Sequence, residues 1–311
     1  MNNPNNSYTK FSHLGMAIDP IHVGTGGNRL GRVDSTIVRD PATQIPKIPG
    51  SSLAGTYRSY SAMAEGKYPQ CAGVGLPQSD GTGGHCGKPD CPICTVYGFA
   101  RGQEGGFAGL AAFSDAHVLL FPVPTRKGVY WITSPNTMRF FSIEIELSQS
   151  AGLYLLDPTN SNSPLNLGWL MLPIMGLKKE VVNKIQEKLQ DLKVPDYVIE
   201  KVGVVSDDLF AHVVNSNLEV RTSVSINPET GAAEDGALFT YEALPRTTFL
   251  YWEIVCKNPN HYRINSKPVS FKQNPQMEDV HYITQKAHPF FEHLGIGGMG
   301  TRGMGRIKVL V

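Results

Sequence analysis

The stretch Ile48-Pro-Gly-Ser-Ser-Leu-Ala-Gly-Thr-Tyr-Arg-Ser59 joins an extended segment to a helix. Residues 33–39, which precede it, have the pattern of extended chain. After Gly50, either Ser51 or Ser52 can serve as the N-cap, because a serine hydroxyl accepts a hydrogen bond from the free N–H groups of a first helical turn. Apolar residues then recur at helical spacing, at Leu53, Tyr57, Tyr60 and Ala64. The sequence therefore predicts a helix that begins at residues 51–52.

The pattern outside this stretch mixes strands and helices without regular alternation. Strands are expected over residues 10–18, 110–123, 130–133, 247–256 and 306–311, and helices over residues 177–192, 207–215 and 278–291. A turn at Asn227-Pro-Glu-Thr-Gly231 predicts a hairpin between residues 218–226 and 237–243. With no internal repeat and no linker, we expect an α+β fold in which residues 1–311 form a single domain.

The composition excludes several classes of protein. Of 311 residues, 41% are hydrophobic and 18% are charged, which is typical of a globular chain and not of a coiled coil, a disordered chain or a collagen-like fibre. No run of 18 apolar residues is present, so no transmembrane helix is expected. Residues 1–9 are rich in asparagine and lack a basic or apolar signal pattern, and we expect a cytoplasmic protein.

The charges are unevenly distributed although the net charge is only +1. Residues 20–60 and 286–311 each carry three more basic than acidic side chains. If the fold brings these two segments together, they would form one anion-binding face. The alternative is that the charges are scattered and solvated.

Four of the five cysteines lie within one window, at Cys71, Cys86, Cys91 and Cys94. In a cytoplasmic chain such a cluster is expected to bind metal rather than to form disulfides. The pair Cys91-Pro-Ile-Cys94 is a knuckle whose two thiolates can reach one tetrahedral zinc ion, and Cys86 can supply a third ligand. The fourth ligand is either Cys71 or His85.

The chain around these cysteines supports a structural role for the zinc. Residues 73–87 are too rich in glycine to build a core, so a metal would supply the missing folding energy. A site with four sulfur-rich ligands is closed, which disfavours catalytic zinc, and free reduced thiols are the other alternative. Cys256 lies in an apolar run and is expected to be a buried core thiol.

Two glycine-rich loops, residues 22–31 and 295–305, each contain arginine. Gly295-Ile-Gly-Gly-Met-Gly300 fits the G-x-G-x-x-G pattern, but only eleven residues follow it, so it cannot open a dinucleotide-binding unit. The first loop lacks the G-K-[ST] ending of a phosphate-binding P-loop. Glycine beside arginine would let a polymer backbone approach and would hold its phosphates. Tight turns at strand ends are the alternative.

The order of these motifs resembles the repeat-associated mysterious protein (RAMP) superfamily. The motifs are His22-x-Gly-x-Gly26, Asp34, the stretch that ends at Arg58-Ser59, and the terminal run from Gly297 to Gly305. The chain is most similar to the backbone subunit of type III CRISPR effector complexes, first the Cmr type and second the Csm type. The knuckle, which Val96-Tyr97-Gly98 follows, is similar to the zinc-binding segment of many such subunits.

This resemblance implies a ferredoxin-like (RRM-like) palm with a zinc-binding insertion at residues 66–107 and a protruding thumb hairpin at residues 218–244. It implies that copies of the chain stack head to tail on a CRISPR guide RNA, together with other effector subunits. The thumbs would flip nucleotides out of the duplex between the guide and a complementary target RNA. A loop aspartate, which matches Asp34 here, would then cut the target at regular intervals.

The chemistry expected of Asp34 is modest, because RNA carries its own nucleophile. A splayed nucleotide can place its 2′-OH in line with the next phosphorus, so the protein supplies positioning and charge stabilisation. One carboxylate can recruit Mg²⁺ or another divalent ion, or it can accept the 2′-OH proton. The products would be a 2′,3′-cyclic phosphate and a 5′-OH. Otherwise Asp34 is an ion-pair or turn residue.

The residues expected to contact RNA are His22, Arg29, Arg32, Ser51, Ser52, Arg58, Gly297, Gly298 and Arg302. His22 could instead transfer a proton or pack the loop, and Arg58 could form a surface ion pair. The candidates that would wedge between bases from the thumb are Val224, Ile226, Leu238 and Phe239, each of which could equally be hairpin core.

Two rival functions fit the same motifs. The chain could be a structural guide-RNA-binding subunit whose Asp34 is inert, or a stand-alone RAMP nuclease that processes CRISPR transcripts.

Overall fold

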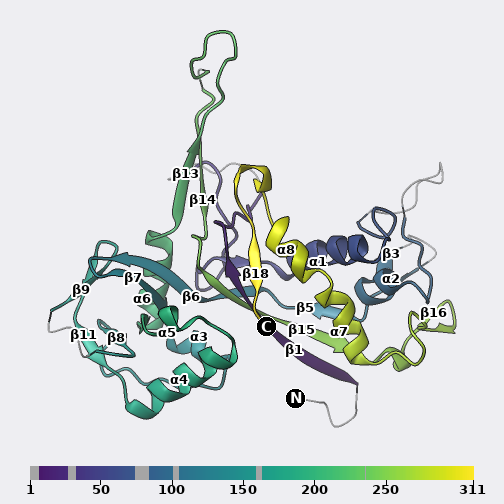
Figure 1. The fold of residues 1–311 in the computed structure, drawn as a ribbon, viewed down its shortest axis with the longest axis horizontal. Helices are drawn as coiled ribbons and strands as arrows, with labels where there is room; N and C mark the ends of the chain where they lie inside the picture. Colours follow the sequence, from purple (N-terminus) through teal and green to yellow (C-terminus); the bar gives the residue numbers. More distant parts are fainter. Residues whose placement is uncertain (1–6, 27–32, 74–83, 101–104, 159–162, 235) are drawn as a thin grey trace. The chain divides into compact units, whose positions relative to one another are not determined.

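The computed structural model describes residues 7–26, 33–73, 84–100, 105–158, 163–234 and 236–311. The chain folds into two compact units that it enters alternately (Figure 1). The first unit consists of Met1–His13, Ile48–Ala116 and Trp252–Ile296, and the second consists of Leu14–Lys47, His117–Tyr251 and Gly297–Val311. Helices and strands are mixed in both units, as expected for an α+β fold. None of the described helices is long and apolar enough to cross a membrane.

Most strands of the main mixed sheet belong to the second unit, and some of its strands cross between the units. Its strand order is β11-β8-β12-β7-β6-β15-β1-β18. The pairs β11–β8 and β12–β7 are parallel, whereas β12–β8, β6–β7, β15–β6 and β1–β18 are antiparallel. The strands are β1 (Tyr8–Ala17), β6 (Ala116–Thr125), β7 (Gly128–Thr133), β8 (Leu153–Leu155), β11 (Ile174–Gly176), β12 (Val202–Val204), β15 (Phe249–Lys257) and β18 (Ile307–Val309). A short hairpin, β9 (Leu165–Leu167) and β10 (Leu170–Leu172), lies outside this sheet.

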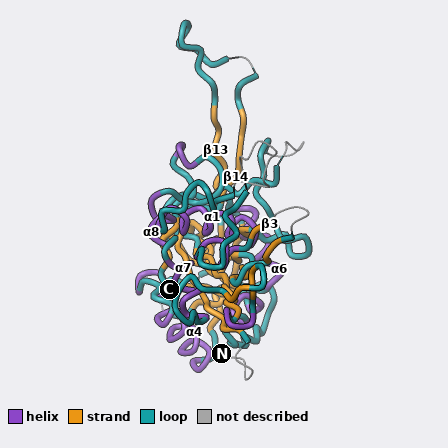
Figure 2. Tube along the Cα trace, turned by 90° about the vertical axis from the view of Figure 1, so that its right-hand side faces the viewer, coloured by secondary structure: helices purple, strands orange, loops and turns teal. Residues whose placement is uncertain are grey.

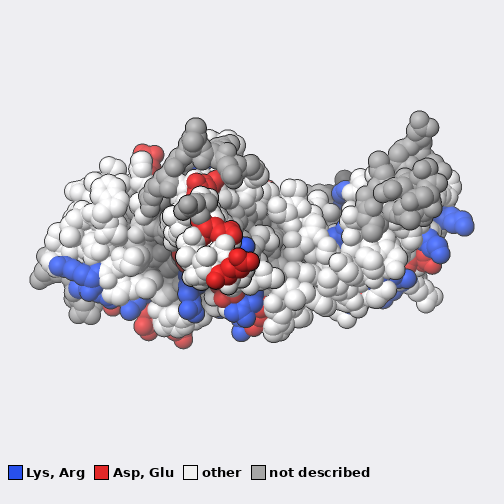
Figure 3. All heavy atoms as spheres, turned by 90° about the horizontal axis from the view of Figure 1, so that it is seen from above, with Lys and Arg blue, Asp and Glu red and all other residues white. Residues whose placement is uncertain are grey.

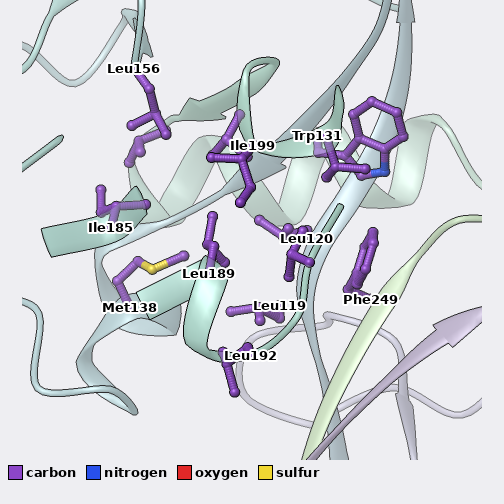
Figure 4. Close-up of a cluster of buried hydrophobic side chains, with 14 of the residues drawn as sticks. Leu119, Leu120, Trp131, Met138, Leu156, Ile185, Leu189, Leu192, Ile199 and Phe249 are labelled. Atoms are coloured by element: carbon purple, nitrogen blue, oxygen red, sulfur yellow. The ribbon is translucent and has the colours of Figure 1, made fainter. Parts of the chain in front are cut away.

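The helices of the second unit are α3 (Pro135–Arg139), α4 (Lys179–Asp191), α5 (Asp196–Ile199) and α6 (Asp207–Ser216). The predicted helix over residues 177–192 therefore exists as α4, and it buries Ile185 and Leu189. Figure 4 shows these two side chains in the same cluster as Leu119 and Leu120 of β6. All four are almost fully buried, so α4 is held by apolar packing and exposes its charged face.

A long hairpin made of β13 (Glu219–Ser223) and β14 (Phe239–Ala243) projects from the second unit (Figures 1 and 2). The two strands are antiparallel, and the pairing runs from Glu219 opposite Ala243 to Ser223 opposite Phe239. At the tip the Asn227 side chain accepts a hydrogen bond from Glu229 N at 2.8 Å, which closes the turn. The hairpin predicted from the turn residues is therefore present.

The first unit packs helices beside the second half of β15. Its helices are α1 (Gly50–Ala64), α2 (Pro92–Tyr97), α7 (Met277–Gln285) and α8 (His288–His293). β5 (Ala111–Phe113) pairs with β15 through residues 254–256, and β3 (Phe99–Ala100) pairs with β4 (Gly106–Phe107). The other short elements of the first unit are β16 (Arg263–Ile264), β17 (Lys267–Pro268) and the 3₁₀ turn Pro259–His261. The 3₁₀ turn Gly300–Arg302 belongs to the second unit, and β2 (Lys47–Ile48) has one residue in each unit.

Two details of the predicted helices are wrong. Helix α1 begins at Gly50 with Pro49 at the N-cap position, and neither Ser51 nor Ser52 caps it. The backbone N–H of Gly50 instead donates to Asp115 Oδ1 at 2.7 Å. A carboxylate that is distant in sequence, and not a local serine, therefore accepts a hydrogen bond at the start of the helix. The single helix expected over residues 278–291 is broken into α7 and α8, because Pro289 in the first turn of α8 lacks an N–H and cannot continue the hydrogen bonds of α7.

Candidate nucleic-acid interface and candidate metal centre

The two glycine-rich segments meet within the second unit. Gly298 N donates to His22 O at 2.8 Å, and Gly305 N donates to Pro20 O at 2.9 Å. Gly297 has a φ of +86°, and a Cβ atom there would lie 2.4 Å from His22 O. Only glycine fits this position without a shift of the backbone. Residues 22–26 and 297–305 therefore form one surface, as the sequence suggested.

His22, the first residue of these segments, is buried, with 5% of its surface exposed. Its Nδ1 lies 2.7 Å from Glu242 O, and its Nε2 lies 3.4 Å from Ser35 Oγ. The ring also meets Tyr241 edge-on, with the centroids 5.9 Å apart. This geometry agrees with loop packing, one of the roles considered for His22, and leaves little of the ring for a bound strand.

Asp34 is exposed and is tied to the base of the β13–β14 hairpin. Thr240 donates to Asp34 Oδ2 twice, from its backbone N at 2.7 Å and from its Oγ1 at 3.0 Å. Asp34 N in turn donates to Thr240 O at 3.1 Å. The hydrogen bonds from the Thr240 backbone and hydroxyl lower the pKa of Asp34 below its usual value. The carboxylate is therefore held in place and ionised at neutral pH, and it forms no ion pair within the described chain.

Glu242 of β14 anchors the segment that carries Asp34, a role that the sequence analysis missed. Arg39 NH2 donates to Glu242 Oε2 at 2.9 Å, and Arg39 NH1 donates to Oε1, so the pair is bidentate. Ile37 N donates to the same carboxylate at 2.9 Å. The partners are about 200 positions apart in sequence, so no local pattern could have revealed the pair.

A pocket of about 600 Å³ lies beside this anchor, and its lining comes from Thr25, from residues 33–44, from α6 and from the start of the hairpin. Val33, Thr36 and Asn215 are among its lining residues. On the other side of the hairpin base, the Arg302 guanidinium lies over Phe239, 5.7 Å from the ring centroid. Arg302 is exposed. Arg29 and Arg32 lie outside the described residues.

The remaining residues expected to contact RNA belong to the first unit. Ser51 and Ser52 lie in the first turn of α1, where Ser51 is exposed and Ser52 half-buried. Arg58, also on α1, is half-buried, and its guanidinium donates to Cys71 O at 2.7 Å and to Gly98 O at 2.8 Å. These intramolecular contacts direct Arg58 into the first unit.

Four cysteines of the first unit gather at one point. They are Cys71, Cys86, Cys91 and Cys94, and their sulfur atoms all lie within 4.8 Å of one another. The sulfurs of Cys86 and Cys94 are 3.6 Å apart, and Cys71 lies 3.8 Å from both Cys91 and Cys94. A tetrahedral zinc ion with Zn–S bonds of about 2.3 Å requires S–S distances of about 3.8 Å. The cluster therefore has the size and the donor chemistry to hold zinc.

The position of His85 distinguishes the two candidates for the fourth member of the cluster. Its Nδ1 lies 2.9 Å from Arg58 NH2 and is not part of the cluster, so Cys71 completes the four-sulfur set. Hydrogen bonding from Cys94 lowers the pKa of Cys91, and the same interaction raises the pKa of Cys94. Helix α2 places both residues, since Cys91 occupies its N-cap and Cys94 its first turn.

Known proteins resemble this chain, one of them along nearly its full length. The endoribonuclease Cmr4 of the CRISPR system Cmr from Pyrococcus furiosus is 26% identical over 309 residues, which cover 94% of this chain and 92% of that protein. The endoribonuclease Csm3 of Enterococcus italicus is 39% identical over only 66 residues, 20% of this chain and 31% of that protein.

Solved structures share the fold. The crystal structure of oligomeric Cmr4 from Pyrococcus furiosus has a TM-score of 0.62 at 19% identity and covers 97% of this chain and 98% of that chain. A chain in the cryo-EM structure of the type III-B Cmr-beta complex bound to cognate target RNA has a TM-score of 0.61 at 15% identity, with 98% of both chains covered. The family model of the RAMP superfamily matches residues 16–308. This chain therefore belongs to the RAMP superfamily.

Proposed function

We propose that this chain is the Cmr4-like backbone subunit of a cytoplasmic type III-B CRISPR ribonucleoprotein, in which it binds guide RNA and cleaves complementary target RNA. Its relatives are named endoribonucleases of CRISPR systems, and one similar chain comes from a complex bound to target RNA. The observation that carries the proposal is the common surface of the second unit, where Asp34 and the two glycine turns border the base of one projecting hairpin.

The glycine turns would receive the ribose–phosphate backbone. Gly24, Gly26, Gly298 and Gly300 are exposed, so a strand can approach the main chain closely there. The exposed Arg302, together with Arg29 and Arg32, would neutralise phosphates. Base pairing with the guide would provide the sequence specificity, so none of these residues needs to read bases.

The hairpin would separate stacked bases. Val224, Ile226 and Leu238 on its shaft are 42%, 53% and 64% exposed, which leaves apolar surface free to contact bases. Viewed end-on in Figure 3, the hairpin shows acidic side chains, and Glu229 and Glu234 near its tip are exposed. Phosphates would repel this tip, so the apolar shaft is the part that we expect to enter the duplex.

Cleavage would use the ribose as nucleophile. The 2′-OH gives up its proton and attacks the adjacent phosphorus, the P–O5′ bond breaks, and O5′ takes up a proton as it leaves. The products are a 2′,3′-cyclic phosphate and a 5′-OH. Asp34 Oδ1 accepts no hydrogen bond from another described residue, so it is free to accept the 2′-OH proton, while Thr240 holds Oδ2. The neighbouring pocket is large enough for a nucleotide that has left the stack.

A divalent ion such as Mg²⁺ also fits this arrangement. Magnesium in phosphoryl sites is commonly held by one or two carboxylates together with phosphate oxygens and water. Asp34 provides one such carboxylate, and a bound RNA would provide the rest. The ion would stabilise negative charge at the reacting phosphate.

The test is target cleavage by the assembled ribonucleoprotein that carries Asp34→Asn. Asparagine keeps the acceptor for Thr240 but cannot take a proton, so cleavage should fall by about 10²–10⁴-fold while target binding is retained. Asp40→Asn is the matched control, because Asp40 accepts turn hydrogen bonds from Ala42 N and Thr43 N. The complex that carries Asp40→Asn should cleave target RNA at the native rate. Cleavage by Asp34→Asn at the native rate would refute the catalytic role and favour an inert structural subunit.

Two further measurements separate the remaining alternatives. The proposal requires guide and target, so RNA cleavage by the purified chain alone would support a stand-alone processing nuclease. The 3′ ends of the cut target should be cyclic phosphates. Ends that carry 3′-OH would exclude attack by the 2′-OH.

The cysteine cluster would hold a structural zinc ion. All four ligands come from protein sulfur, so no position remains for a substrate, and the ion would contribute folding energy. Copies of the chain would associate head to tail, a contact that extends as an open filament until other subunits end it.

A further inference from the structure

Arg58 is a half-buried cation without a carboxylate partner among the described residues. Its guanidinium donates to three neutral acceptors: Cys71 O at 2.7 Å, Gly98 O at 2.8 Å and His85 Nδ1 at 2.9 Å. A buried charge normally requires an opposite charge nearby, and the four clustered cysteine sulfurs, when deprotonated around a metal ion, are the groups beside Arg58 that can balance it.

Each of the three acceptors of Arg58 lies at or next to a part of the chain that supplies one or two of the clustered cysteines. Cys71 O belongs to one ligand residue itself, and His85 is the neighbour of Cys86 in the sequence. Gly98 follows helix α2 directly, and its N–H donates to Cys94 O at 3.0 Å. The Arg58 side chain therefore contacts a residue in or beside each of the three chain segments that carry the four cysteines.

We propose that Arg58 is the counter-cation and the brace of the four-cysteine metal site, rather than a ligand of RNA phosphate. This inference rests on the zinc part of the proposed function. Four thiolates around Zn²⁺ carry a net charge of −2, and the guanidinium beside them offsets part of it. The planar fork of arginine also explains the residue type, because it reaches three acceptors in different directions where the single ammonium group of lysine cannot.

The experiment measures zinc in the full-length chain. Zinc content and the rate of zinc release to a colorimetric chelator are compared for the native protein, Arg58→Gln, Arg58→Lys and the control Arg126→Gln. Among the described residues, the Arg126 guanidinium also donates to neutral groups, Ser163 Oγ and Pro164 O, but it lies in the second unit. Loss of a group that supports metal ligands commonly weakens metal binding 10–100-fold. We expect Arg58→Gln to release zinc faster by about this factor, Arg58→Lys by less, and Arg126→Gln not at all.

RNA binding supplies the second measurement. With zinc in excess, Arg58→Gln should bind a guide-length single-stranded RNA with the native salt dependence, because no phosphate contact has been removed. Loss of one phosphate contact would reduce the slope of log affinity against log salt by about 0.7. A reduced slope combined with native zinc release would overturn the inference in favour of RNA binding.

The other outcomes are equally distinct. Native-like zinc release from both Arg58 variants would overturn the inference while the zinc proposal stands. A native chain that contains no zinc and takes up none would overturn the zinc proposal and this inference with it. If Arg58→Gln yields no folded protein, Arg58→Lys decides, because it keeps the charge and loses the fork: faster release supports the brace, and native release refutes it.

Discussion

The buried pair between Arg39 and Glu242 is expected to be a main attachment of the Asp34 segment, and Glu242→Ala tests this. The side chains of Arg39 and Glu242 retain only 21% and 10% of their exposure. Removal of one partner from a buried ion pair costs about 3–5 kcal/mol, because the other charge is left without a partner. Arg39 keeps its bonds to Asn215 Oδ1 at 2.8 Å and Ile37 O at 3.0 Å, so the lower end, about 3 kcal/mol, applies.

Glu242→Ala also removes the acceptor of a second hydrogen bond, the one that the backbone N–H of the buried Ile37 donates. Glu242→Gln separates the two contributions, because its amide oxygen can still accept from Ile37 N while its charge is gone. We expect Glu242→Gln to cost about half as much as Glu242→Ala. The assay is urea denaturation of the purified chain, followed by a signal from the second unit such as fluorescence of the buried Trp131.

The double variant Arg39→Met with Glu242→Ala completes the cycle. If the pair is coupled as the bidentate geometry indicates, the double variant should be less destabilised than the sum of the single variants by at least about 1 kcal/mol. Additive costs, or a cost of Glu242→Ala below about 1 kcal/mol, would show that the pair is screened in solution and does not hold the segment.

Three further predictions follow from single contacts. Thr240→Val removes one of the two donors that lower the pKa of Asp34, so the acid limb of target cleavage should shift to higher pH, whereas Thr240→Ser should restore the native profile. His85→Ala should keep the native zinc content, because His85 lies outside the four-sulfur cluster, and a loss of zinc would make it a ligand. Burial lowers the pKa of His281 to about 4 and of His288 to about 3, below the ordinary 6.5, so the unfolded chain binds protons first as the pH falls. The contribution of these two histidines to stability should be complete above about pH 6.5 and decline below it toward about pH 4, and urea midpoints that stay flat over this range would contradict their half-buried, neutral state.

Local patterns predicted the elements whose stability is local. The helix over residues 177–192 and the hairpin around Asn227-Pro-Glu-Thr-Gly231 both exist, because amphipathic spacing and turn chemistry are contained in a short window. The N-cap of α1 could not be predicted in the same way. Asp115, which accepts the hydrogen bond from Gly50 N, is 65 positions away, and the nearby Ser51 and Ser52 do not cap the helix.

The sequence pattern also did not indicate that the chain divides into two units. At several of its crossings between the units the chain stays within one strand; for example, β1 contains both His13 and Leu14, and β15 contains both Tyr251 and Trp252. No loop or linker marks a boundary that lies inside a strand. The crossing between Ile296 and Gly297 lies in the terminal glycine run, which the sequence pattern indicates as a turn and not as a boundary between units.

The cysteine cluster was predictable except for its last member. The spacing of Cys86, Cys91 and Cys94 indicates three candidate ligands, but spacing alone could not choose between Cys71 and His85. Contacts that are distant in sequence distinguish the two, because Arg58 of another helix binds the imidazole of His85, whereas the sulfur of Cys71 lies in the cluster. Such contacts leave no trace in local spacing.

The meeting of the two glycine turns follows from the register of one strand pair. β1 and β18 are antiparallel, with Ala17 opposite Ile307, so the chain that leaves β1 and the chain that enters β18 lie at the same end of the sheet. The bridge between Ile21 and Leu244 then brings β14 of the hairpin to the same place. Two pairings thus bring the three parts of the proposed RNA site together. The glycines themselves determine only how closely the two chain segments can approach each other, and how closely a bound RNA backbone can approach them.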